Sequence, residues 1–164
     1  SDRSTYSELH EIFPSADLIF TSGSTFMTRP MMDQKENGPF VFSSGREGRY
    51  LNKVDVSIVN DGDQIINRSY HEAKINYFKK RIDRYRDKDP SVPLDELYSE
   101  QPSILSSILE SQDEIKRMEK ILTQKTNSIT FQNIAMESKI KDNPEMLDHV
   151  NNSIKKCKDL IYNP

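Results

Sequence analysis

Apolar residues in the later part of the chain recur every three or four positions, which is the spacing of one face of an α-helix. The first such stripe consists of Ile75, Phe78, Ile82 and Tyr85. Pro90 and Pro93 follow it, and proline disfavours continuation of a helix. The spacing predicts a helix from about Ser69, as N-cap, to Lys88.

Two more helical stretches follow. One begins near Pro102, which suits the first position of a helix. Its apolar residues at heptad spacing are Ile104, Ile108, Ile115, Met118 and Leu122. This helix either continues past Ile129 towards Ile140 or breaks at residues 126–128, which offer a cap for a new helix.

The last stretch opens with Asn143 as N-cap and Pro144 at the first helical position. Its apolar stripe, with alternating steps of three and four, consists of Leu147, Val150, Ile154, Cys157 and Ile161. Such spacing is typical of a helix that packs lengthwise against another helix. Position 157 falls on this stripe, so we expect Cys157 to be buried rather than reactive.

The first 66 residues have a different character, because all five glycines lie there. We expect a short helix from Ser4 or Thr5 to Ile12, a short strand at residues 17–20, and a loop over 21–38. Residues 39–66 alternate between apolar and polar, with a turn at 60–63, and predict a small hairpin or meander.

Together these patterns predict a mainly α protein, α+β overall. We expect a loop-rich part with short strands over residues 1–66, then a helical hairpin or coiled-coil interaction region over 67–164. The hydrophobic share is 34% and the charged share 30%, against roughly 45–50% and 25% in typical globular domains. So lean a composition favours apolar stripes that are completed by a partner over one thick core.

No sequence motif indicates catalysis. Three histidines far apart and a single cysteine do not form a zinc pattern, and no glycine-rich phosphate loop is present. We therefore expect a protein that is not an enzyme and has no cofactor or metal. No apolar run approaches the roughly 18 residues of a membrane span, and no signal-peptide pattern opens the chain. We expect an intracellular protein without membrane partners, with the nucleus favoured by the basic cluster at 79–81.

The main functional hypothesis is a non-catalytic subunit of a larger multiprotein assembly, a scaffold component that contacts other subunits by helix–helix packing. Its candidate partner-binding residues are Ile108, Ile115, Met118, Leu122, Leu147, Val150, Ile154 and Ile161. An intrachain helical bundle would use the same heptads, so that alternative stays open.

The second hypothesis is a nucleic-acid-binding module. Residues 68–88 carry eight basic and three acidic side chains, and positive charge of this density suits phosphate. Candidate contacts on this helix are Lys79, Lys80, Arg81 and Arg84. The same charges also suit the solvated face of a helix whose other face is buried.

Overall fold

The structure is a computed structural model that describes residues 3–21, 26–32, 34 and 39–162. Contacts within the chain define two compact units, residues 1–134 and residues 135–164. The elements of the first unit are α1 (Arg3–Ile12), β1 (Leu18–Thr21), β2 (Phe40–Ser43), β3 (Tyr50–Ser57), β4 (Ile66–Asn67), α2 (Arg68–Arg86), α3 (Leu94–Leu97), α4 (Pro102–Leu122) and β5 (Ser128–Ala135). β5 ends at the first residue of the second unit, which contains α5 (Pro144–Tyr162).

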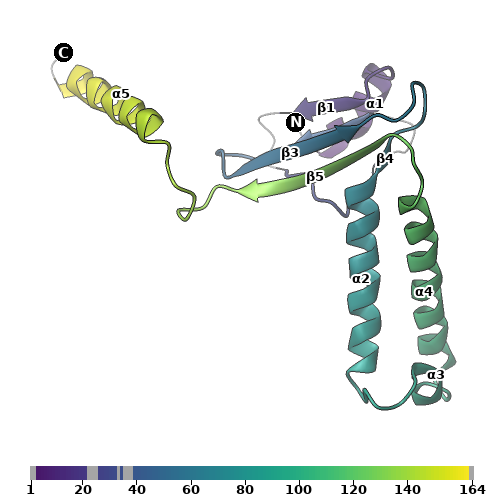
Figure 1. Ribbon diagram of the computed structural model, residues 1–164. Helices are drawn as coiled ribbons and strands as arrows, with labels where there is room; N and C mark the ends of the chain where they lie inside the picture. The colour runs from purple at the N-terminus through teal and green to yellow at the C-terminus, as the bar shows by residue number, and fades with distance from the viewer. Residues whose placement is uncertain (1–2, 22–25, 33, 35–38, 163–164) are drawn as a thin grey trace. The chain divides into compact units, whose positions relative to one another are not determined.

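Two small sheets make up the β-structure in the described part of the first unit. β1 and β2 pair in parallel, with Leu18 opposite Phe40. β5 is the central strand of the other sheet, between β3 and β4, and pairs in parallel with β4. Figure 1 shows that β3 and β5 run in opposite directions.

The core of the β-region is aromatic and aliphatic. Alternate residues of a strand share a face, so β2 contributes Phe40 and Phe42 while β5 contributes Ile129 and Phe131. The rings of Phe42 and Phe131 meet edge to face, with centroids 5.0 Å apart. Both sheets therefore share one core.

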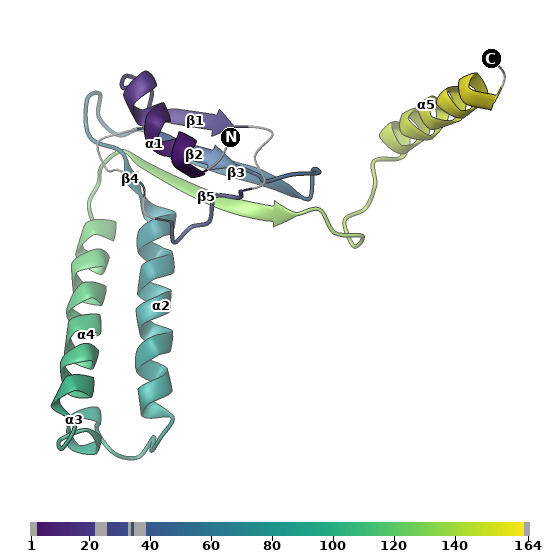
Figure 2. The same ribbon diagram turned by 180° about the vertical axis from the view of Figure 1, so that it is seen from behind.

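α2 and α4 lie side by side in both views (Figures 1 and 2). Their apolar stripes face each other, because Ile75 and Ile82 of α2 are buried with Ile115 and Met118 of α4. At one end of the pair, the Arg68 guanidinium donates to the Leu122 carbonyl oxygen at 3.0 Å. The apolar stripes of α2 and α4 are therefore buried against each other within the first unit.

Hydrogen bonds tie the start of α2 to β5. The N-cap is Asn67, whose side-chain oxygen accepts from the Tyr70 backbone N–H at 3.1 Å. The predicted cap, Ser69, has another role: its hydroxyl accepts from the Phe131 N–H at 2.8 Å and donates to the Phe131 carbonyl at 3.0 Å. The other two predicted helix starts are confirmed, since Pro102 begins α4 and the Asn143 side chain accepts from the Met146 N–H at 3.1 Å.

The predicted mainly α architecture with coiled-coil segments is wrong. The chain is 45% helical and 20% strand, with two sheets, which is a mixed α+β fold. The predicted hairpin is also absent, because β2 pairs with β1 and β3 pairs with β5. The region after Leu122, expected to be helical, contains β5 because Ile129 and Phe131 alternate with exposed or half-buried positions.

The predicted division into residues 1–66 and 67–164 stays a prediction; at that boundary β4 passes directly into α2. Among the described residues, no helix is both long and apolar enough to cross a membrane.

Candidate functional site

The helix α5 carries an exposed apolar stripe. Met146, Leu147, Val150 and Ile154 are between 43% and 62% exposed. The three-four spacing places the last three along one face of the helix. Cys157 on the same stripe is also exposed, so the expectation that it is buried is wrong. The reason is that no described residue of the second unit covers this face. Ile161 lies where side chains fall outside the described part.

The remaining surface of α5 is polar and electrically balanced. Three acidic residues and three lysines are spread over the helix, namely Glu145, Asp148, Asp159, Lys155, Lys156 and Lys158. We define the α5 stripe as Leu147, Val150, Ile154 and Cys157. It is the largest set of regularly spaced apolar side chains that the described structure leaves exposed on one helix.

The predicted anchors on α4 are placed differently. Ile108 is only 1% exposed, Ile115 and Met118 are buried, and Leu122 packs against the same cluster. The packing of Ile115, Met118 and Leu122 against α2 is the intrachain packing that the heptads also allowed. A role for these four residues in binding a partner stays a prediction.

The basic side chains of α2 mostly contact this chain. Lys79 forms an ion pair with Glu119 at 3.0 Å, and Arg81 donates to the Ser107 hydroxyl. Lys80 and Arg84 have no ion pair among the described residues, and they line a surface depression together with Tyr77, Asp83 and Asp87. Because two acids line the same depression, it offers little net attraction to phosphate.

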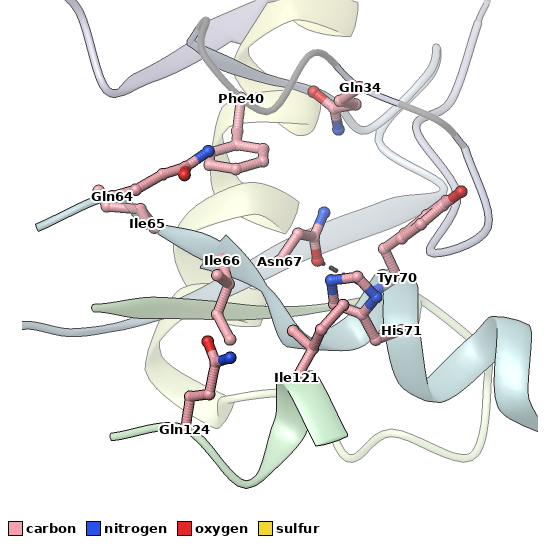
Figure 3. Close-up of a pocket in the computed structure, with 10 residues that line it drawn as sticks. All are labelled: Gln34, Phe40, Gln64, Ile65, Ile66, Asn67, Tyr70, His71, Ile121 and Gln124. Atoms are coloured by element: carbon pink, nitrogen blue, oxygen red, sulfur yellow. Dashed lines mark hydrogen bonds between the residues drawn. The ribbon is translucent and has the colours of Figure 1, made fainter. Parts of the chain in front are cut away.

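A cavity of about 190 Å³ lies where β2, β4, the start of α2 and the end of α4 meet (Figure 3). Its walls combine apolar and amide side chains: Gln34, Phe40, Gln64, Ile65, Ile66, Asn67, Tyr70, His71, Ile121 and Gln124. Gln64 and Gln124 are exposed, so the opening of the cavity lies on their side. None of these residues was predicted as a site, because they come from four separate segments.

Comparison of the chain with protein-family models, with curated proteins and with solved structures finds no match. Functional interpretation therefore rests on the geometry of these surfaces. In the part of the chain that the structure describes, no three His, Cys, Asp or Glu side chains are grouped closely enough to hold a metal ion.

Proposed function

We propose that this chain is a non-catalytic interaction subunit that docks α5 into an apolar groove on a partner protein. The observation that carries the proposal is the α5 stripe, whose apolar residues are exposed although their spacing is that of a packed helix face. Helices that bind in grooves present anchors at this spacing.

The α5 stripe contributes a modest part of a binding free energy. Burying one Val, Leu or Ile side chain contributes about 1.5–3 kcal/mol. Leu147, Val150 and Ile154 are each less than half exposed in the free helix, so together they contribute about 2–4 kcal/mol on further burial. Met146 and Cys157 add to this, and ordering the helix opposes it. These terms suit a reversible contact rather than a permanent one.

A groove on another protein fits α5 better than a second copy of α5. The helix has 19 residues, about 28 Å, and most of the stability of a helix in a protein comes from packing of its apolar face. A coiled coil between two copies is set by opposite charges beside the apolar stripe. Here the flanking positions hold Asn151, Ser153 and Lys158, which supply no such pair.

A lipid surface also fits less well. Helices that lie on membranes carry an excess of Lys and Arg on their polar face. In α5 three lysines are matched by three acidic residues.

The test compares two variants with the same added charge. Ile154→Asp places a carboxylate on the α5 stripe, whereas Asn152→Asp places one on the opposite face. Each full-length chain is used to capture proteins from an extract of its native cells, with and without nuclease, after circular dichroism has verified the fold.

We expect the unaltered chain and Asn152→Asp to retain the same stoichiometric protein and Ile154→Asp to lose it, whether or not nuclease is added. Retention by all three chains would contradict the proposal. A protein lost only after nuclease treatment would favour the basic helix α2 instead. Sedimentation of the purified chain adds a further check. If the chain dimerises and Ile154→Asp abolishes the dimer, α5 binds a second copy of this chain and not a partner protein, which would contradict the proposal.

A further inference from the structure

The cavity beside the start of α2 has a polar wall of fixed orientation. The Asn67 side chain is buried, and its Oδ1 accepts from the Tyr70 backbone N–H at 3.1 Å. This bond determines which end of the amide caps the helix, so the Nδ2 group is turned away from the helix. Figure 3 shows Nδ2 directed into the cavity.

Gln34 supplies a second amide of fixed orientation from the opposite wall. Its Oε1 accepts from the Val41 backbone N–H at 2.6 Å. Its Nε2 is buried and has no hydrogen-bond partner among the described residues. In Figure 3 this nitrogen points towards the same space as the nitrogen of Asn67. Two donors therefore face one cavity, and neither can reverse without losing its backbone contact.

A buried donor without an acceptor is costly, so this arrangement favours a bound acceptor. Water can supply one, but the cavity of about 190 Å³ is several times the roughly 30 Å³ that one water occupies, and a 150 Å³ apolar cavity is known to hold benzene. The cavity also has apolar walls against which a molecule of this size can pack, formed by Phe40, Ile65, Ile66 and Ile121.

We propose that this cavity binds a small neutral molecule in which an apolar body carries a carbonyl oxygen, held between the amide nitrogens of Asn67 and Gln34. A neutral carbonyl fits better than a carboxylate, because no Lys or Arg is among the described lining residues and an unpaired buried charge is expensive. His71 and Tyr70 are the titratable groups at the wall.

The test uses three probes and the full-length, nitrogen-labelled chain. Acetophenone presents a carbonyl on an aromatic ring, α-methylstyrene has nearly the same shape without the oxygen, and benzoate carries the charge. Acetophenone and benzoate are titrated to about 10 mM and α-methylstyrene to its solubility limit, because ligands of this size bind in the millimolar range, and the probes are compared at equal concentrations. Proton–nitrogen correlation spectra report on the side-chain amides of Asn67 and Gln34.

Two isosteric variants remove one donor each and keep the backbone contact. Asn67→Asp still accepts from Tyr70, and aspartate is as good an N-cap as asparagine. Gln34→Glu still accepts from Val41. Gln132→Glu adds the same charge at an exposed position of β5 away from the cavity lining and serves as the control.

We expect acetophenone to shift both amide signals in a saturable way and to bind at least about tenfold more weakly to Asn67→Asp and to Gln34→Glu, with Gln132→Glu unchanged. Equal binding of α-methylstyrene would show an apolar cavity only and overturn the proposal. Tighter binding of benzoate than of acetophenone would overturn the choice of a neutral ligand. Absence of any saturable shift would overturn the site itself.

Discussion

Asn127 is the residue whose removal tests the fold most sharply. It is only 3% exposed and lies just before β5. Its Oδ1 accepts from the backbone N–H groups of Val59 and Asn60 at 2.7 and 3.1 Å. Its Nδ2 donates to the carbonyl oxygens of Asn60 and Asp63 at 2.7 and 2.8 Å. One side chain thus holds the turn between β3 and β4 in place.

The cost of Asn127→Ala follows from these four hydrogen bonds. A typical net contribution is about 0.5–1.5 kcal/mol each. The backbone groups of the turn belong to exposed residues, and water can replace part of what they lose. We therefore take the lower part of that range, about 0.5–1 kcal/mol for each bond, and expect a loss of about 2–4 kcal/mol in the free energy of unfolding.

The assay is urea denaturation followed by far-ultraviolet circular dichroism, with the slope m compared between the variants. Asn60→Ala is the matched control in the same turn. It keeps the backbone groups that contact Asn127 and removes only the exposed side-chain bond to Asp63 at 2.7 Å. We expect Asn60→Ala to change the free energy of unfolding by less than about 0.5 kcal/mol.

Equal effects of Asn127→Ala and Asn60→Ala would refute this reasoning, as would a loss below about 1 kcal/mol for Asn127→Ala at unchanged m. Either result would mean that the turn is held by contacts other than the Asn127 amide.

Three further predictions concern separate parts of the first unit. Ile108→Ala, at a side chain that is 1% exposed, should lower the free energy of unfolding by about 2–5 kcal/mol, whereas Leu109→Ala, at 51% exposure, should change it little; urea denaturation separates the two. Lys79→Ala should lower the free energy of unfolding by less than about 1 kcal/mol in the same assay, because both side chains of the pair with Glu119 are about half exposed and exposed pairs contribute little. A larger loss would contradict the view that this ion pair is a weak surface contact. The pKa of the Asp89 carboxyl is lowered by the hydrogen bond from the Ser91 hydroxyl and then by that from the Ser91 backbone N–H. Ser91→Ala should raise that pKa towards its ordinary value, which a carboxyl-carbon NMR titration would detect. A lowered carboxyl pKa adds stability above the unfolded-state pKa that is lost as the pH falls through the folded-state pKa, so the variant should lose less stability in that acidic range.

The helices were largely predictable from local pattern. The stripe beginning at Ile75 located α2, and the prolines at positions 102 and 144 marked the starts of α4 and α5. These signals are local, because a helix is specified by neighbours three and four residues apart. The apolar spacing of α5 was likewise predictable from the sequence, whereas the exposure of the stripe was not.

The strands were harder to predict because their partners are distant. Ser69 and Phe131 are 62 residues apart in sequence and exchange two hydrogen bonds. Leu122, Ile129 and Met136 are seven apart, which places them on one face of a helix but on alternating faces of a strand, so periodicity alone favoured the wrong element there. In the structure, residues 128–135 form β5, and Phe131 of this strand contacts Phe42 in the core.

The cavity was not predictable for a related reason. Gln34 and Asn67 are an ordinary loop residue and an ordinary N-cap in the sequence. Their amides face one space only because β2 and the start of α2 lie on opposite sides of it. The burial of Cys157 was wrongly predicted because a stripe gives the face of a helix but not whether anything covers it.

The lone cysteine allows the most direct measurement of what α5 contacts. Cys157 lies on the α5 stripe and is exposed, so a photo-cross-linker attached to its thiol samples the immediate surroundings of the stripe. The matched control moves the thiol to the opposite face, in a chain that carries Cys157→Ser and Asn152→Cys.

Both labelled chains are irradiated in an extract of the native cells, and the adducts are identified by mass spectrometry. We expect one protein to be cross-linked from position 157, to be absent from position 152, and to be lost when Ile154→Asp is added. Adducts of equal yield from both faces, or adducts with a second copy of this chain alone, would contradict docking of α5 into a groove on a partner protein.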